Sequence, residues 1–559
     1  MIKKAILSLF LANSVVGISQ TTTTTSNNAS ITGNIESTFQ YLRADSLIGA
    51  TLPPEKGLLN SYMNAFYTQG NFKAGVRIES YLPHINGYPN RFEGTGLGMR
   101  YIGYTNHMVD VTLGNFYEQF GSGLLFRSYE NRALGYDNAM DGMRLIVRPH
   151  AGVVLKGVYG QQRQDFKGQI IHAAGIVRGL DGEIHFNELI KGMKDKKFDV
   201  TLGGSFVSKY QKDDNDLLIL PQNVGSYGGR MKLRYGKLTF DGEYVIKEND
   251  PSSDNHYVYN NGHAALFNIG YSKKGFGISV SGKSCDNMSY RSDRTQALQV
   301  DLINYLPSMN KTHTYNLVAS LYPYATQLNG EIAYQTEIVY TIPKGSKLGG
   351  KYGTTINANF STAYKPIQST TGINTLDSTG VAYHCKPFDM SSTLYWQDIN
   401  VSISRKFSKS FNLIVSYFDI KLNNDVAKVT EDANGIITSH VGVVEFGYKI
   451  NKAHSIRVEL QELVTNKGAG RDKGDWATAV LEYNYKSNWF FGVMDQYNYS
   501  NPEEDLRIHY IIGTVGYVEG STRFTLSVGR QRAGLFCVGG VCRNVPASNG
   551  LTLSFTQSF

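Results

Sequence analysis

The chain alternates apolar and polar residues with a period of two over most of its length. In residues 72–79 every second side chain is apolar, and the same pattern recurs on both sides of Gly236. Because successive residues of a strand point to opposite faces, this pattern predicts strands with one apolar and one polar face. The sequence therefore predicts an all-β fold.

The connections between these strands are of two kinds. Alternating segments of about 10 residues are joined in turn by short turns and by longer polar loops, which is the asymmetry of a transmembrane antiparallel β-barrel. A soluble β-sandwich or propeller also alternates, but its strands are shorter, about 5 to 6 residues. We therefore expect a large barrel with an even number of strands, roughly 20 to 26. The short turns expected to face the periplasm are residues 70–71, 236–237, 408–410, 452–453, 487–488 and 519–520.

Composition excludes two other classes of protein. The mean hydropathy of −0.28 is too polar for a bundle of membrane helices, each of which needs about 20 consecutive apolar residues. The net charge of +8 is small for 559 residues and is spread along the chain, so we expect no nucleic-acid partner.

The N-terminus carries an export pattern. Lysines precede an apolar stretch at residues 5–12, and small residues follow at Gly17 and Ser19. This pattern predicts a secretory signal peptide for the general secretory pathway, because the apolar stretch is too short for the alternative, a membrane anchor. The expected domains are the signal peptide at residues 1–19, a disordered polar leader at residues 20–30 and an outer-membrane β-barrel at residues 31–559.

The last residues form a regular amphipathic strand that ends on an aromatic residue. Such a strand resembles the signal that outer-membrane barrels present to their assembly machinery. It must also pair with the first strand, because a sheet edge cannot stay open in hydrocarbon. The expected partners are therefore outer-membrane lipid and the barrel-assembly machinery. The assembly-signal residues are Leu551, Leu553, Phe555 and Phe559.

Two motifs carry a resemblance to a known family. One is Leu-Gly-Asn-Phe-Tyr-Glu-Gln-Phe-Gly-Ser-Gly-Leu at residues 113–124, and the other is Cys-Val-Gly-Gly-Val-Cys-Arg at residues 537–543. With these motifs, residues 31–559 resemble an uncharacterised family of outer-membrane β-barrel proteins from Bacteroidota. The resemblance implies the fold and the location, and it implies no chemistry.

Residues 116–137 break the alternation. Glycines in this segment permit backbone turns that other residues resist, and charged residues of both signs follow one another closely. Two interpretations stay open: an ordinary extracellular loop, or a segment that folds into the lumen and narrows it or binds a solute. The residues expected to form such a lumen constriction are Glu118, Arg127, Glu130, Arg132 and Asp137.

Four cysteines in an exported chain permit disulfides. Cys537 and Cys542 are separated by a short glycine-containing turn, so we expect a local bridge between them, whereas spacing gives no support to a bridge between Cys285 and Cys385. The sequence contains no nucleophile elbow, zinc helix or phosphate loop. We therefore expect no enzymatic activity, no cofactor and no metal site.

Two functions from different classes remain. The first is a channel or transport protein for hydrophilic solutes, because the polar face of every strand lines the lumen of a wide barrel. The alternative is a structural or assembly subunit of a larger outer-membrane complex whose pore is closed. A conductance step in a planar bilayer distinguishes the first from the second.

Overall fold

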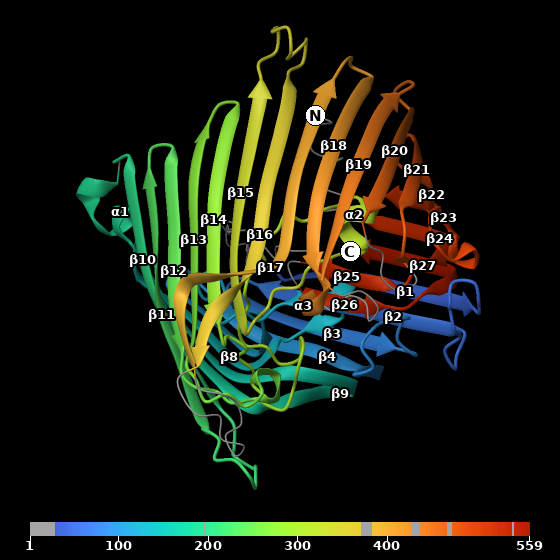
Figure 1. Ribbon diagram of the computed structural model, residues 1–559. Helices are drawn as coiled ribbons and strands as arrows, with labels where there is room; N and C mark the ends of the chain where they lie inside the picture. Colours follow the sequence, from blue (N-terminus) through green and yellow to red (C-terminus); the bar gives the residue numbers. More distant parts are fainter. Residues whose placement is uncertain (1–27, 195, 371–382, 428–434, 467–471, 539–540) are drawn as a thin grey trace.

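The computed structural model describes residues 28–194, 196–370, 383–427, 435–466, 472–538 and 541–559. Within them, 23 strands form one closed sheet (Figure 1). The first and last strands of this sheet, β1 and β27, pair antiparallel from Asn34–Ser558 to Arg43–Asn549. The predicted all-β barrel is confirmed. The predicted signal peptide at residues 1–19 lies outside the described residues.

The strands follow one another around the ring in chain order. Its first third contains β1 (Ser30–Arg43), β2 (Gly57–Gln69), β3 (Phe72–Tyr81), β4 (Phe92–Thr105), β5 (Val109–Phe116), β8 (Met140–His150) and β9 (Val153–His185). The next are β10 (Phe198–Tyr210), β11 (Asn223–Tyr235), β12 (Leu238–Lys247), β13 (Gly262–Lys273), β14 (Phe276–Asp286), β15 (Gly330–Ile342), β16 (Thr354–Thr370) and β17 (Tyr383–Lys406). The last are β18 (Phe411–Asn423), β19 (Ile436–Lys449), β20 (His454–Thr465), β21 (Trp476–Tyr485), β22 (Trp489–Asn498), β23 (His509–Glu519), β24 (Thr522–Gln531) and β27 (Ser548–Ser558).

The remaining elements are short and lie in the connections. None of the helices among the described residues is long and apolar enough to cross a membrane. These elements are β6 (Glu130–Asn131), β7 (Tyr136–Asp137), β25 (Gly534–Val538), β26 (Val541–Val545), α1 (Phe186–Leu189), α2 (Asn316–Ser320), α3 (Asn424–Ala427), and the 3₁₀ turns η1 (Arg132–Leu134), η2 (Lys191–Met193), η3 (Ser253–Asn255) and η5 (Glu504–Leu506).

The alternation predicted from the sequence places apolar side chains on the outer face of the ring. On β3, Val76 and Ile78 are exposed by 47% and 46%, whereas Arg77 and Glu79 between and beside them are buried on the inner face. Aromatic pairs such as Trp489 with Tyr517 gather beside the short turns. An outer apolar face with aromatic residues at its rim is the surface that a lipid bilayer requires.

One strand, β9, folds back on itself. Residues 153–162 pair with β8 and residues 176–185 pair with β10. These two arms lie side by side, because the backbone N–H of His185 donates to the carbonyl of Gly152 at 2.7 Å. A closed antiparallel ring needs an even number of arms, since direction alternates at each step. The two arms of β9 satisfy this requirement, which a sheet of 23 single strands could not meet.

The turn of β9 also pairs with β4, beyond the point where the shorter strands β5 and β8 end. Residues 101–105 of β4 pair with β5. Earlier in the same strand, residues 92–97 lie parallel to residues 166–169 at the turn of β9. The β5–β8 hairpin therefore ends within the wall, and β4 and β9 meet beyond its end.

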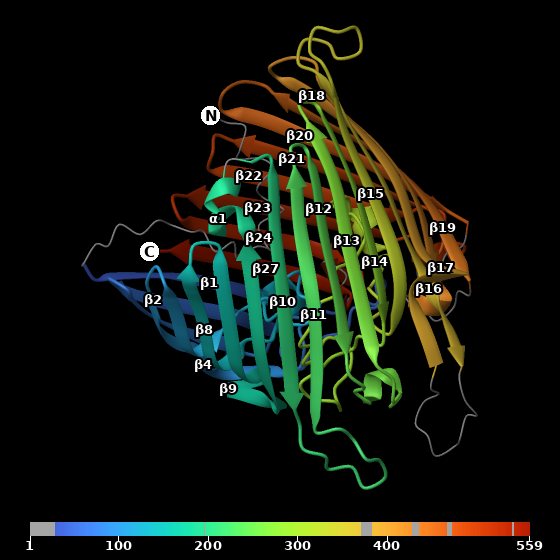
Figure 2. The ribbon, with the colours of Figure 1, turned by 90° about the vertical axis from the view of Figure 1, so that its left-hand side faces the viewer.

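The two ends of the barrel carry different connections. All six predicted short turns join strands at one end, which we call the short-turn end. Most of the longer connections occupy the other end, called the long-loop end, and the one at residues 211–222 projects away from the ring (Figure 2). Two others, residues 186–197 and 343–353, lie at the short-turn end. Two of the long connections, at residues 117–139 and 287–329, follow a different course.

We expect the effect of a substitution in β27 on folding of the barrel to depend on whether the substituted side chain faces lipid or the lumen. Leu553 faces outward beside Phe39 and Leu526, so Leu553→Arg should cost about 2 to 4 kcal/mol of folding free energy in the membrane. The neighbouring Ser554 faces the lumen, and Ser554→Arg serves as the matched control. The amount of folded barrel is read from heat-modifiable migration on a gel. Equal folding of both variants would contradict the assigned faces.

Candidate functional site

Two chain segments leave the wall and fold into the lumen. Residues 117–139 connect β5 to β8, and residues 287–329 connect β14 to β15. They join each other through backbone hydrogen bonds from Arg127 to Ile303, at 2.8 Å, and from Tyr305 to Gly123, at 2.9 Å. Figure 1 shows α2, which belongs to the second segment, inside the ring. We call the two segments together the plug.

The first segment is held to the wall by ion pairs. Asp137 accepts a bond of 2.9 Å from Arg163 of β9, and the same guanidinium binds Glu79 of β3 at 2.7 Å. Glu130 pairs with Arg77 of β3 at 2.9 Å. Arg163 and Glu79 are each only 1% exposed, so these charges are stabilised by one another rather than by water.

A second ionic contact lies at the start of the same segment. Glu118 accepts bonds of 2.7 Å from Arg144 of β8 and 2.8 Å from Lys156 of β9. Burial alone would raise the pKa of Glu118, but the charges of Lys156 and Arg144 outweigh it and lower the pKa. Nearby, the backbone N–H of Ser122 donates to Glu243 of β12 at 2.8 Å. The segment thus contacts inner faces on separated parts of the ring.

The structure brings four of the five predicted constriction residues into these networks. Arg132 binds Glu130 at 2.9 Å and Glu36 of β1 at 2.6 Å. Arg127 lies elsewhere, with its guanidinium 4.4 Å and 4.1 Å from the ring centres of Tyr129 and Tyr305. The sequence pattern predicted charges of both signs here, but it could not indicate that an aromatic pair would hold one of them.

A tight turn positions these charges. Asn131 caps η1 through a bond from the N–H of Leu134 to its side-chain oxygen. Gly135 follows with φ of +63°, and a Cβ there would lie 2.4 Å from Pro89. Glycine is therefore required both by the backbone conformation and by the close approach of Pro89. This turn lies directly between Arg132 and Asp137.

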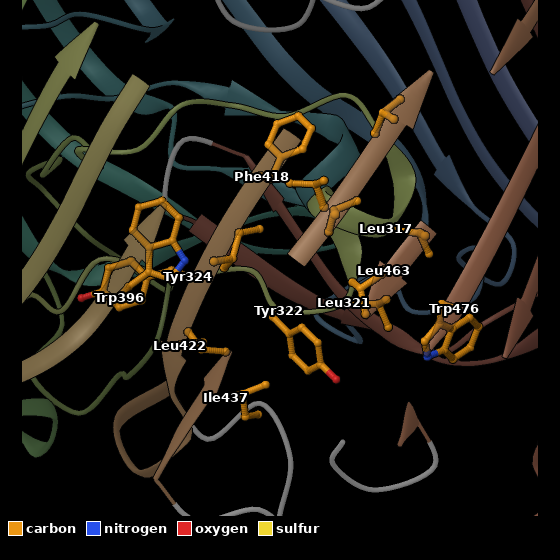
Figure 3. Close-up of a cluster of buried hydrophobic side chains, with 14 of the residues drawn as sticks. Leu317, Leu321, Tyr322, Tyr324, Trp396, Phe418, Leu422, Ile437, Leu463 and Trp476 are labelled. Atoms are coloured by element: carbon orange, nitrogen blue, oxygen red, sulfur yellow. The ribbon is translucent and has the colours of Figure 1, made fainter. Parts of the chain in front are cut away.

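The second segment is held mainly by apolar packing. Leu317, Leu321 and Tyr322 pack against side chains of the opposite wall, as Figure 3 shows. Tyr324 stacks on Trp396 of β17 with ring centres 5.8 Å apart. Polar contacts add to this packing, since His313 lies 2.6 Å from Asp398. The wall residues in this cluster include Phe418, Leu422, Ile437, Leu463 and Trp476.

The sequence analysis missed this second segment. Residues 287–329 contain no regular alternation, and so long an interruption between strands is the signal that could have indicated a folded insertion. The spacing of apolar residues there, such as Leu317 and Leu321, has no regular period, so it could not distinguish a plug from an outer loop.

Burial decreases along the lumen wall away from the plug. On the inner face of β12, Lys247 and Val245 are fully buried, Glu243 is half-buried and Asp241 is exposed. Lys232, which pairs with Asp241 across β11 and β12, is also exposed. The plug therefore fills the long-loop half of the lumen and leaves charged wall at the short-turn end in contact with water.

Cys285 is fully buried in an apolar cluster that includes plug residues such as Phe120 and Tyr290, whereas Cys385 is only partly buried. The β25–β26 pairing places Cys537 opposite Cys542, but their side chains lie outside the described part, so the predicted disulfide stays a prediction. Cys285 and Cys385 are free thiols. Among the described residues, no group of three or more His, Cys, Asp or Glu side chains is placed to hold a metal ion.

The predicted assembly-signal residues share the outer face of the closing strand. Leu553 is 38% exposed and Phe559 is 55% exposed, while Phe555 packs against Phe524 at 4.7 Å between ring centres. The backbone of Phe559 exchanges two hydrogen bonds of 2.9 Å with Gly33 of β1. Leu551 lies opposite Tyr41 and Val528, both on the same outer face.

Comparison with known proteins places the chain in a family. The model of the family of unknown function DUF6029 matches residues 1–559. The chain belongs to the DUF6029 family. No curated protein matches this DUF6029 member in sequence. The Bacteroidota origin implied by the two sequence motifs stays a prediction.

Solved barrels share weak similarity with this DUF6029 protein. The siderophore receptor PirA from Pseudomonas aeruginosa aligns with a TM-score of 0.41 at 10% identity, over 96% of this chain and 81% of PirA. OccK3 (OpdO) from the same organism aligns with a TM-score of 0.35 at 9% identity, over 81% of this chain and 95% of OccK3. These scores are too low to transfer a function.

The ionic contacts of the plug give a stability prediction. Arg163→Gln should leave Glu79 and Asp137 with only Arg77 as a counter-charge, at the longer distances of 3.5 and 3.8 Å, at a cost of about 3 to 5 kcal/mol. We expect faster hydrogen exchange in residues 117–139. Arg178→Gln, on the same strand but exposed, is the control and should leave this exchange unchanged. Equal exchange in both variants would show that the ion pairs do not hold the segment.

The plug should also respond to pH through Asp301. Burial and the charge of Asp293 raise the pKa of Asp301 to about 7, although Gln164 donates a bond of 2.6 Å to it. The folded plug then retains a proton that the unfolded chain loses at lower pH, so its stability falls as pH rises toward 7. Asp301→Asn should remove this fall.

The pH response can be measured as hydrogen exchange in residues 287–329, corrected for intrinsic rates, from pH 5 to pH 8. As pH rises over this range, hydrogen exchange in these residues should become faster in wild type than in Asp301→Asn. If the exchange rates of the two proteins changed with pH in parallel, the pH response could not be assigned to Asp301.

Proposed function

We propose that this DUF6029 protein is an integral outer-membrane barrel that passes hydrophilic solutes through a lumen controlled by its plug. The apolar outer face supports membrane insertion, and the short-turn end would face the periplasm as in other barrels. The exposed inner charges at that end, such as Asp241 and Lys232, carry the proposal, because a charged, water-filled half of the lumen can admit hydrophilic solutes.

Passage would require the plug to move or partly open. Its first segment is joined to the wall by ion pairs such as Asp137 with Arg163, whose partners water can replace once the contact opens. Its second segment rests on apolar side chains such as Trp396 and Trp476, which water replaces at a higher cost. The first segment is therefore the part that we expect to open. In keeping with the sequence analysis, we propose no catalytic role.

The alternative is a closed structural or assembly subunit of an outer-membrane complex. The apolar packing of Leu317, Leu321 and Tyr324 against the wall favours it, because such a core resists opening without a partner. Under this alternative the barrel co-purifies with fixed partners in mild detergent and does not conduct.

Planar-bilayer conductance tests the proposal. In the test variant, residues 121–136 and 290–327 are replaced by Gly-Ser linkers, which should open the lumen and raise single-channel conductance severalfold over wild type. The matched control replaces residues 213–219, which belong to the projecting loop (Figure 2), with the same type of linker and should conduct like wild type. Because a barrel without its plug conducts under either hypothesis, wild type decides between them. Conductance steps in wild type are expected for a transport protein, and a wild type that does not conduct beside a conducting plug variant would contradict the transport proposal and favour the closed subunit.

A further inference from the structure

The connections at the short-turn end are rich in lysine. Within the described chain they contain twelve lysines, all exposed, and a single carboxylate, that of Glu188. Seven successive connections, from the one after β9 to the one after β21, each contribute at least one lysine. The positive charge therefore follows the rim, where α1 also lies (Figure 1), rather than forming one patch. We call these residues the rim lysines: Lys191, Lys194, Lys196, Lys197, Lys237, Lys274, Lys344, Lys347, Lys351, Lys409, Lys452 and Lys486.

The rim lysines form no ion pair within the described chain. The lysines that do so belong to the inner wall or to residues 211–222, and they are Lys73, Lys156, Lys209, Lys212, Lys232 and Lys283. The long-loop end has the opposite balance of charge, because acidic residues outnumber basic ones in its connections. Examples are Asp213, Asp214, Asp216, Glu503, Glu504 and Asp505. The two ends of the barrel thus differ in sign, and only the short-turn end attracts anions.

Exposed apolar side chains lie next to the rim lysines in the chain. Ile190 precedes Lys191 and is 45% exposed, and Leu348 follows Lys347 and is 68% exposed. Ile450, in the connection that contains a further rim lysine, is 51% exposed. Cationic and apolar side chains that alternate at one level fit the boundary between lipid headgroups and acyl chains. A dissolved anion would match the charge but would give these apolar side chains no contact.

The rim lysines also lie at the level of the aromatic side chains. The Lys486 ammonium is 5.2 Å from the ring centre of Tyr485, which pairs across its hairpin with Trp489 on the outer face. The Lys351 ammonium lies 5.9 Å from the ring centre of Tyr352. Aromatic residues at the edge of a barrel occupy the headgroup level of the bilayer. The lysines beside them are therefore at the depth of lipid phosphates.

We propose that the rim lysines bind the phosphate groups of anionic phospholipids in the leaflet at the short-turn end. Ile190, Leu348 and Ile450 would reach the acyl boundary of the same leaflet, while the acidic long-loop end repels these lipids. The proposal rests on membrane insertion of the barrel, which is part of the proposed function, and it does not depend on passage of a solute. Under the orientation proposed above, the leaflet is the periplasmic one.

The test measures which lipid surrounds the barrel. Full-length protein is reconstituted in phosphatidylcholine bilayers that contain spin-labelled phosphatidylglycerol or spin-labelled phosphatidylcholine. Electron paramagnetic resonance then gives the fraction of each label that is immobilised at the protein. We expect wild type to prefer phosphatidylglycerol about three- to fivefold at low salt. Salt at about 1 M should weaken this preference, because it screens exposed charges.

Two variants locate the preference on the barrel. Both replace six lysines with glutamine, and their folding is checked by heat-modifiable migration on a gel. The rim variant carries Lys344→Gln, Lys347→Gln, Lys351→Gln, Lys409→Gln, Lys452→Gln and Lys486→Gln, and should lower the preference about twofold. The matched control changes the long-loop end and should keep the wild-type preference, because carboxylates already dominate there. It carries Lys56→Gln, Lys167→Gln, Lys212→Gln, Lys365→Gln, Lys386→Gln and Lys473→Gln.

Several results would overturn the proposal: no preference in wild type, a preference that salt does not weaken, an unchanged rim variant, or equal loss in both variants. An acidic soluble partner of the rim would give the first of these results. If the rim variant does not fold, the salt dependence of wild type decides. Conductance of wild type is recorded separately in uncharged bilayers, so failure of the transport proposal is distinguished from failure of lipid binding.

Discussion

An alternating strand cannot present an apolar face to lipid without turning a polar face into the lumen. In this barrel that constraint determines what occupies the interior. A ring with this many strands is too wide for its own side chains to fill, so each inward charge needs either water or a partner from elsewhere in the chain. The short-turn half uses water, as the exposed Asp241 shows. The long-loop half uses the plug.

The two plug segments meet this constraint in different ways. The first brings charges to the charged wall around Arg163 and Glu79, and such buried pairs fix position more than they add stability, since desolvation offsets much of their attraction. The second segment covers an apolar part of the wall around Trp396 and Leu422, where burial supplies a net driving force. The ion pairs on one side of the lumen therefore fix where the plug lies, and the apolar packing on the other side stabilises it there.

Sequence reasoning predicted what repeats along the chain. Alternation in residues 72–79 identified both faces of β3, and lost alternation at residues 116–137 marked an unusual segment. The partners of that segment could not be predicted, because Arg163 and Glu79 lie on strands whose neighbours in space follow from closure of the ring. Residues 287–329 were missed for a related reason, since an irregular segment acquires its burial only from the wall around it.

The wall where β4 meets β9 has a consequence for the shape of the lumen. Because β5 and β8 end before this contact, the rim at the long-loop end has two strands fewer than the wall below it. At about 4.8 Å for each strand, this shortens the circumference there by roughly 10 Å. The bore therefore narrows toward the end that holds the plug. A plug that moves as one body meets a tightening wall in one direction and a widening wall in the other, so its free path leads toward the short-turn end.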